Sequence, residues 1–157
     1  MAADDGGSMT AVVDSNIIAS LFLPSSYSAQ SSDLMKSWDE AEERLIAPTL
    51  FEYEMATIVR RSVITGQLQK GQALDVLAQL LNSRVETVSP SAALHRDALR
   101  LAERIGQSKA YDAHYLALAA REDASFWTAD KRLANAAQAS GLTWVHWIGD
   151  WTPGEAR

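Results

Sequence analysis

The sequence predicts a three-layer α/β/α domain with a central, mostly parallel sheet. Short apolar or β-branched runs alternate along the chain with segments whose apolar residues recur at helical spacing. Parallel strands need a crossover of about a dozen residues or more, and a helix usually supplies it. The chain has 157 residues, of which 47% are hydrophobic, so it is long enough and apolar enough for one domain with a buried core.

The chain is expected to form one domain with two short ends. Residues 1–8 carry small and acidic side chains with nothing to bury, which indicates a disordered N-terminal extension or a remnant of cloning. Residues 9–150 form the expected domain, and residues 151–157 form a C-terminal tail. No apolar run approaches the roughly 18 residues that span a bilayer. The chain contains no cysteine, which excludes disulfides, cysteine zinc sites and thiol nucleophiles and favours a cytoplasmic location.

The first third of the chain is predicted to form strand, helix, helix and strand. Residues 10–13 are β-branched or apolar and form the first strand, which ends at Asp14. Apolar residues at helical spacing follow at once, and a second amphipathic helix is expected around residues 34–41. A brief strand over residues 44–47 should stop at Pro48, because proline lacks the amide hydrogen that a central strand needs.

The same alternation continues to the end of the chain. Glycines that follow periodic segments are typical helix ends, and hydroxyl side chains that precede them are typical helix caps. The predicted elements are a helix from Thr49 toward Gly66, helical leucine spacing over 69–81, a strand over 85–88, a helix over 91–105 before Gly106, a helix over 111–120, a strand over 125–128, a helix to Gly141 and a strand over 145–148.

Four acidic residues follow strands or begin helices in this predicted arrangement. Asp14 comes directly after the first strand, and Asp130 closely follows the strand over 125–128. The carboxyl ends of parallel strands meet at one edge of an open sheet, and ligands bind at that edge. Asp112 starts one helix and Glu54 lies near the start of another, so both can also point there. We therefore expect the four carboxylates to share one pocket.

Carboxylates that lie close together favour binding of a hard divalent cation. Their repulsion either raises their pKa values or recruits a cation, and oxygen ligands suit Mg²⁺ or Mn²⁺. Such an ion lowers the pKa of a bound water and neutralises charge on a phosphodiester during hydrolysis. The sequence contains neither a GxxxxGK[ST] loop nor an HExxH motif, which removes two competing kinds of site. Its formal net charge of −6 means that nucleic-acid binding requires metal ions or a local basic patch.

Four segments that contain these acids occur in the order seen in a known family. They are VVDSNIIASLF, APTLFEYEMATIVRR, AYDAHYLALA and WTADKRL. With them the chain resembles the PIN-domain nucleases, and among these the VapC-type ribonuclease toxins of toxin–antitoxin pairs, over essentially residues 10–148. The resemblance implies an α/β/α fold, RNA cleavage that depends on Mg²⁺ or Mn²⁺, frequent homodimerisation and inhibition by a cognate antitoxin protein.

The resemblance also assigns roles to individual residues. Asp14, Glu54, Asp112 and Asp130 would be the catalytic acids; of these, Asp14 and Asp112 would contact the metal, and Asp130 would do so directly or through water. Thr128 matches the hydroxyl-bearing position of the family and would support an acid or a metal-bound water. Ser15 and Asn16, which follow the first acid, are assigned supporting roles. Thr57 stands where many relatives carry asparagine.

Several of these residues could instead have purely structural roles. Asp14 is also a plausible helix cap, and Asp112 is a favourable charge at a helix N-terminus. Glu52 is a rival to Glu54, because helical spacing alone does not separate the two and the preference rests on the resemblance. His114 is expected to pack or face solvent. Possible contacts to RNA phosphates are Arg60, Arg61, Lys109, Lys131 and Arg132.

The acids are also compatible with two other functions. A nuclease of this fold can act in RNA maturation or on structured DNA, and a catalytically idle PIN module can serve as a binding scaffold. Retention of all four acids argues against the idle module. We therefore expect a metal-dependent endoribonuclease, the toxin of a type II toxin–antitoxin pair, with RNA as its substrate.

Overall fold

The computed structural model describes residues 9–152, and at its centre lies a five-stranded sheet with strand order β3-β2-β1-β4-β5. Every strand pairing in this sheet is parallel. The predicted parallel sheet is therefore confirmed. The strands are β1 (Thr10–Val13), β2 (Arg44–Pro48), β3 (Glu86–Val88), β4 (Ser125–Thr128) and β5 (Val145–Trp147).

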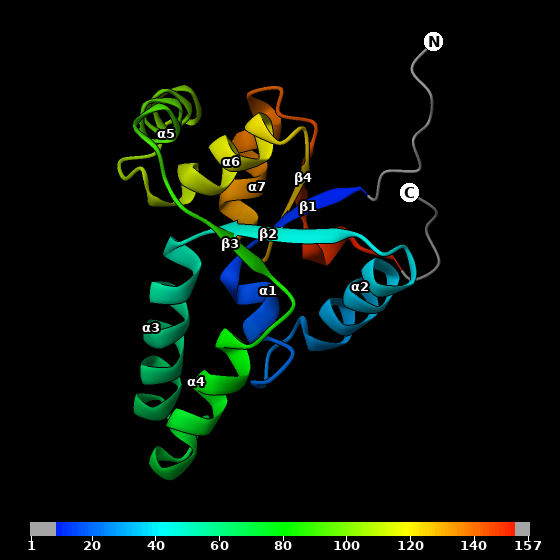
Figure 1. Ribbon diagram of the computed structural model, residues 1–157, viewed down its shortest axis with the longest axis vertical. Coiled ribbons are helices and arrows are strands. Elements are labelled where there is room, and N and C mark those ends of the chain that lie inside the picture. The colour runs from blue at the N-terminus through cyan, green and yellow to red at the C-terminus, as the bar shows by residue number, and fades with distance from the viewer. Residues whose placement is uncertain (1–8, 153–157) are drawn as a thin grey trace.

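Helices cover both faces of the sheet and complete the predicted three-layer α/β/α architecture. In Figure 1, α5, α6 and α7 lie above the sheet, whereas α1 to α4 lie below it. Because parallel crossovers are right-handed and the strands extend from β1 in both directions, the helices between β1 and β3 cover one face and those between β3 and β5 cover the other. The α-helices are α1 (Ser15–Ala19), α2 (Ser28–Glu40), α3 (Leu50–Ile64), α4 (Ala73–Leu81), α5 (Ala92–Ile105), α6 (Tyr111–Arg121) and α7 (Lys131–Ala139), and two 3₁₀ turns are η1 (Lys70–Gln72) and η2 (Ile148–Asp150).

The middle strand and the helix above it form the centre of the core. Ala11, Val12 and Val13 of β1 are completely buried, because helices cover both faces of this strand. Helix α6 packs against β1, β2 and β4, and its residues 115–119 are buried without interruption. A helix that is apolar nearly all round is typical of such a central position. The alanines in this run permit close approach to the sheet.

Several element ends differ from the sequence-based expectations. Pro48 does not stop β2 but is its last, buried residue, paired with Val88 at the end of β3. Asp14 occupies the N-cap of α1, as its structural alternative predicted, but its side chain makes no capping bond. Thr49 precedes α3 without a side-chain capping bond. The expected helix over 69–81 begins with a 3₁₀ turn, and α2 starts well before residue 34.

The C-terminal end of the domain reaches beyond the expected boundary at residue 150. Trp151 lies in the expected tail, yet it is buried and packs edge-on against Trp127 with ring centroids 5.7 Å apart. Its indole N–H donates a hydrogen bond to Asp33 of α2. The expected extension over residues 1–8 lies outside the described residues. Among residues 9–152, none of the helices combines the length and the apolar character needed to cross a membrane.

Removing a core side chain from α6 should destabilise the whole domain. Leu116 is fully buried, so we expect Leu116→Ala to lower the free energy of unfolding by about 2–5 kcal/mol, measured by urea denaturation. Leu99 on α5 is 66% exposed, and Leu99→Ala should change the same quantity by less than about 0.5 kcal/mol. Equal losses in the two variants would contradict the core described here.

Candidate active site

The pairing of β1 with β4 brings two acids to one edge of the sheet. Val13 and Trp127 are partners in the parallel register, and the amide of Asp14 donates a hydrogen bond of 3.0 Å to the carbonyl of Trp127. Asp130 follows two residues after the end of β4, at the first position before α7. Asp14 and Asp130 therefore lie at the carboxyl ends of neighbouring strands, the end of an open parallel sheet at which ligands bind.

Thr128 connects these two acids through hydrogen bonds. Its hydroxyl donates to Oδ2 of Asp14 at 2.6 Å, and it accepts a bond of 3.0 Å from the backbone amide of Asp130. Ser15 donates to the other carboxylate oxygen of Asp14 at 3.2 Å. Asp130 also caps α7 by accepting the amide hydrogen of Leu133. The positions of both acids are thus fixed by the surrounding protein.

A buried tyrosine holds the third acid. The Tyr115 hydroxyl donates a hydrogen bond of 2.5 Å to Oε1 of Glu54, which joins α6 to α3. Tyr115 is 1% exposed, and its ring stacks on Phe126 of β4. Sequence reasoning missed this residue. The available signal was a hydroxyl one helical turn after Asp112, within an otherwise apolar run.

The electrostatics of the acids show that they influence one another. Burial and, to a smaller extent, the charge of Asp112 raise the pKa of Asp14 to about 6, although hydrogen bonds from Thr128 and Ser15 oppose the shift. Burial, followed by the charges of Asp14 and Asp112, raises the pKa of Glu54 to about 7, against the hydrogen bond from Tyr115. Burial raises the pKa of Asp112, with a further contribution from the charge of Asp130.

The donor set at this edge is chemically suited to a hard cation. Carboxylates and hydroxyls are oxygen donors, which Mg²⁺ and Mn²⁺ prefer, and like charges near one another are stabilised by a cation. Among residues 9–152, no three acidic or histidine side chains are already arranged as a metal cage. Mg²⁺ does not require one, because it usually takes one or two carboxylates and keeps several water molecules.

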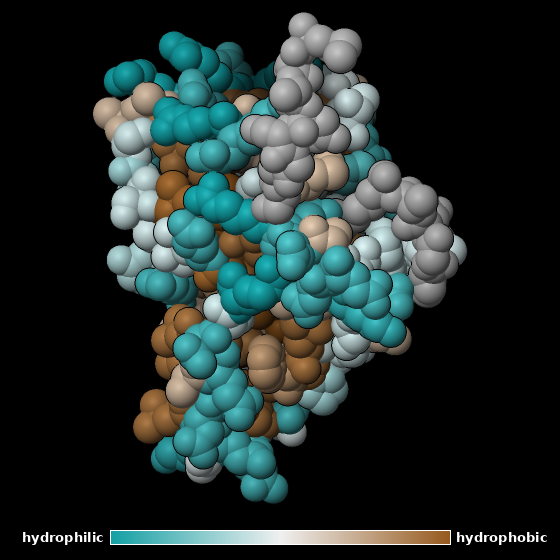
Figure 2. All heavy atoms as spheres, turned by 45° about the vertical axis from the view of Figure 1, so that its right-hand side comes forward, coloured by the Kyte–Doolittle hydropathy of each residue, from teal (hydrophilic) through white to brown (hydrophobic). Residues whose placement is uncertain are grey.

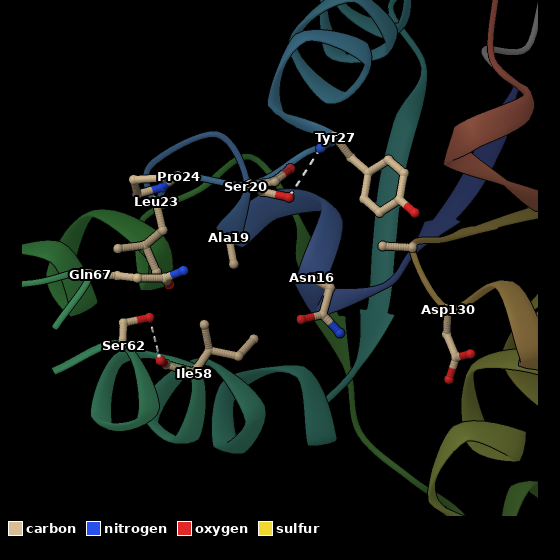
Figure 3. A pocket seen from close by; sticks show the side chains of 12 residues that line it. Asn16, Ala19, Ser20, Leu23, Pro24, Tyr27, Ile58, Ser62, Gln67 and Asp130 are labelled. Atoms are coloured by element: carbon tan, nitrogen blue, oxygen red, sulfur yellow. Dashed lines mark hydrogen bonds between the residues drawn. The ribbon is translucent and has the colours of Figure 1, made fainter. Parts of the chain in front are cut away.

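Two adjoining hollows open beside the acids. The acidic cleft, of about 560 Å³, lies between α3 and the start of α6 and is lined by Ser15, Asn16, Leu50, Tyr53, Glu54, Thr57, Ile58, Arg61, Lys109, Tyr111 and Asp112. The side groove, of about 420 Å³, is lined by Asn16, Ala19, Ser20, Leu23, Pro24, Ser25, Tyr27, Ile58, Ser62, Gln67, Ala129 and Asp130. Figure 3 shows Asn16 and Asp130 toward one end of the side groove and Ser62 and Gln67 toward the other. Asn16 and Ile58 line both hollows, so the two lie side by side.

The structure distinguishes Glu54 from Glu52 and shows which of the basic residues line the hollows. Glu52 is exposed and lines neither hollow, whereas Glu54 lines the acidic cleft. Arg61 and Lys109 line the same cleft, but Arg60 and Arg132 line neither hollow. The ammonium of Lys131 lies 4.7 Å from the centre of the Trp147 ring, in a cation–π contact.

His114 has a packing partner rather than a position among the acids. Its Nε2 lies 2.8 Å from Nδ1 of His95 on α5, and its Nδ1 lies 2.7 Å from the carbonyl of Ala110 at the start of α6. The contact therefore joins α5 to the end of α6 that carries Asp112.

The raised pKa of Asp14 predicts that, in the absence of metal, this residue destabilises the fold as the pH rises. A group whose pKa is higher in the folded state stabilises the fold below its unfolded pKa, here 3.8, and loses that contribution as the pH rises through about 6. The difference between the pKa values of 3.8 and about 6 corresponds to at most about 3 kcal/mol in the free energy of unfolding. In EDTA we therefore expect Asp14→Asn to raise the free energy of unfolding relative to the original chain more at pH 8 than at pH 4. Chemical denaturation at both pH values measures this difference, and a difference that is the same at both would contradict the assignment.

Comparison with known proteins agrees with this geometry. Residues 11–139 match the sequence profile of the PIN domain. Over 127 residues the chain is 32% identical to ribonuclease VapC3 from Pyrobaculum aerophilum. The aligned region covers 80% of this chain and 93% of that protein.

Solved structures also share the fold. One is VapBC2 from Rickettsia felis bound to a DNA fragment from their promoter, with a TM-score of 0.64 and 15% identity over 88% of this chain and 98% of that chain. Another is FitAB bound to a DNA fragment, with a TM-score of 0.65 and 13% identity over 92% and 99% of the two chains. At such identities these structures show the fold alone. The sheet topology, the profile match and the similarity to a named ribonuclease together show that this chain belongs to the PIN-domain family.

Proposed function

We propose that this chain is a metal-dependent endoribonuclease and the toxin of a type II toxin–antitoxin pair. The observation that carries the proposal is that the charges of Asp14, Glu54, Asp112 and Asp130 influence one another at one end of the sheet. Glu54 and Asp112 line the acidic cleft there, and Asp130 lines the adjoining side groove. The relative that is named a ribonuclease supports RNA as the substrate. The reaction is hydrolysis of a phosphodiester, in which a water oxygen bonds to phosphorus and a phosphorus–oxygen bond to the leaving nucleotide breaks.

Each acid has a distinct role in this proposal. Asp14 and Asp112 would hold Mg²⁺ or Mn²⁺, and Asp130 would do so directly or through water. The ion, when bound, would lower the pKa of a coordinated water and offset the charge that builds on the phosphate. Glu54 accepts the proton of the attacking water, and a pKa of about 7 suits a general base near neutral pH. Thr128, through its bond to Asp14, keeps that carboxylate in place.

The proposed partners are an antitoxin and a second copy of the chain. The solved structures similar to this chain, VapBC2 and FitAB, are complexes, which supports a partner protein. For the second copy, support comes from apolar side chains exposed on and near α3 and α4, namely Ile64 at 67%, Leu74 at 80% and Leu81 at 48%. In Figure 2, hydrophobic side chains gather over the lower part of the molecule, toward which α3 and α4 extend in Figure 1.

The chain offers a matched pair of acids to test the proposed site. We expect Glu54→Gln to lower the rate of RNA cleavage in Mg²⁺ by about 100-fold or more, because the general base is lost. Glu52→Gln on the same helix turn removes the same charge outside the hollows and should leave the rate within about twofold of the original. Cleavage is followed on a labelled RNA, with EDTA abolishing it and added Mg²⁺ or Mn²⁺ restoring it.

Two further variants extend this test to the metal-binding acids. Asp14→Asn and Asp112→Asn should each abolish cleavage while leaving the circular dichroism spectrum unchanged. Undiminished cleavage in both variants, or cleavage that persists in EDTA, would refute the proposed site.

The hydrogen bond from Tyr115 predicts a shift in the pH profile. That bond lowers the pKa of Glu54, because it stabilises the ionised carboxylate. Tyr115→Phe keeps the ring against Phe126 but removes the hydroxyl, so the pKa of Glu54 should rise. We expect the acid limb of kcat/KM against pH to move to higher pH, with activity at the alkaline plateau largely retained. A lower plateau with an unmoved acid limb would mean that Tyr115 has only a packing role.

A further inference from the structure

Two tyrosine rings stand exposed at the rim of the acidic cleft. Tyr53 is 74% exposed and Tyr111 is 64% exposed, and both line the cleft. Each immediately precedes one of the acids, Glu54 on α3 and Asp112 on α6. Large rings are usually buried when they serve only the fold, so an exposed pair on one cleft beside acidic side chains indicates a binding surface.

Each wall of the cleft combines a ring with a cation. On α3, Tyr53, Thr57 and Arg61 recur every four residues, which places them along one face of the helix, and all three line the cleft. On the opposite wall, Lys109 precedes Tyr111, the first residue of α6. The two rings and two cations thus come from segments that are distant in the sequence but face one hollow.

In the part of the chain that the structure describes, no polar or ring partner explains the positions of these side chains. Within the described part of the chain, neither ring makes a hydrogen bond or a ring–ring contact. Arg61 and Lys109 likewise take part in no ion pair there, although Glu54 and Asp112 line the same cleft. The rings remain available for stacking and the cations for anions.

We propose that the acidic cleft is a subsite for one unpaired nucleotide of RNA, whose base stacks against the rings of Tyr53 and Tyr111 and whose flanking phosphates contact Arg61 and Lys109. This inference rests on the proposed ribonuclease function and adds the side chains that would recognise the base and its flanking phosphates. In a duplex, each base is already stacked on its neighbours and its faces are not accessible to side chains. A stacking subsite beside the catalytic acids therefore selects single-stranded segments, loops or bulges.

The charge of the protein makes such a subsite physically useful. A formal net charge of −6 repels an RNA backbone at long range, so binding cannot rely on a broad basic surface. Stacking on an aromatic ring is a short-range contact that depends little on the sign of the net charge. Two phosphate contacts supply only a modest electrostatic contribution. The rings would therefore provide most of the affinity for the base, and the cations would orient the backbone.

The test measures RNA binding separately from cleavage. In an Asp14→Asn background, which removes a catalytic acid that does not line the cleft, a short fluorescein-labelled RNA of mixed sequence is titrated by fluorescence anisotropy. Tyr53→Leu and Tyr111→Leu are expected to weaken binding by roughly fivefold to 100-fold each, as removal of a stacking ring does. Tyr53→Phe and Tyr111→Phe keep the rings and should bind within about twofold of the background chain. Leu99→Ala, on the exposed face of α5, is the surface control.

The salt dependence of binding distinguishes the rings from the cations. For single strands the logarithm of the binding constant falls with the logarithm of salt concentration with a slope of about −0.7 per phosphate contact. Arg61→Gln and Lys109→Gln should each make the slope shallower by about 0.7. The two leucine variants should lower affinity at every salt concentration while leaving the slope unchanged. An RNA duplex of the same sequence should bind the background chain more weakly and should not respond to either leucine variant.

The outcomes separate this inference from the proposed function. If leucine at both positions leaves the affinity for unpaired RNA unchanged while Glu54→Gln still abolishes cleavage, the subsite is refuted and the nuclease stands. Equal losses for unpaired and duplex RNA would also overturn it, since stacking on an accessible base would not be the cause. Loss of affinity for the phenylalanine variants as well would assign the effect to the hydroxyls and contradict stacking.

Discussion

The parallel pairing of β1 with β4 is the constraint on which the rest of the site depends. It places Asp14 and Thr128 at the ends of adjacent strands, so that the threonine hydroxyl reaches the carboxylate at 2.6 Å. The same hydroxyl accepts the amide of Asp130 and fixes the turn into α7. Helix α6, packed across β1, β2 and β4, then brings Asp112 and Tyr115 to this edge, and Tyr115 holds Glu54 of α3. One strand pairing thus determines where four acids meet.

Placing these carboxylates close together and away from water is energetically unfavourable, which indicates that they serve a function other than stability. Burial disfavours an ionised carboxylate, and neighbouring negative charges add to that effect, which raises the pKa values of Asp14 and Glu54 to about 6 and about 7. A domain selected for stability alone would replace these groups or pair them with arginine. In the proposed function a bound cation supplies the counter-charge. Arg61 and Lys109, which make no ion pair within residues 9–152, lie on the walls of the cleft, where a phosphate backbone could reach them.

Sequence patterns predicted the fold better than they predicted the contacts of the site. The alternation of short apolar runs and amphipathic segments predicted the parallel sheet, because parallel strands require helical crossovers. Gly106 correctly predicted a helix end, where the backbone has a positive φ of 73° that glycine adopts easily. Local rules were wrong where tertiary packing decided, as for Pro48 inside β2 and Trp151 against Trp127. Tyr115 was missed because its partner, Glu54, is distant in the sequence and only the packing of α6 beside α3 joins them. The same holds for Tyr53 and Tyr111, whose common cleft exists only in the folded chain.

In the proposed function these carboxylates form one cation site, and calorimetric titration with Mn²⁺ tests that site most directly. Carboxyl groups with raised pKa values must release protons when a cation binds, so titrations in buffers of different ionisation enthalpy should reveal proton release at pH 6 and much less at pH 8. Affinity should fall at least about tenfold in Asp14→Asn and Asp112→Asn, as loss of a direct ligand does. Mn²⁺ binding that is unaffected by both variants and releases no protons at either pH would contradict the account.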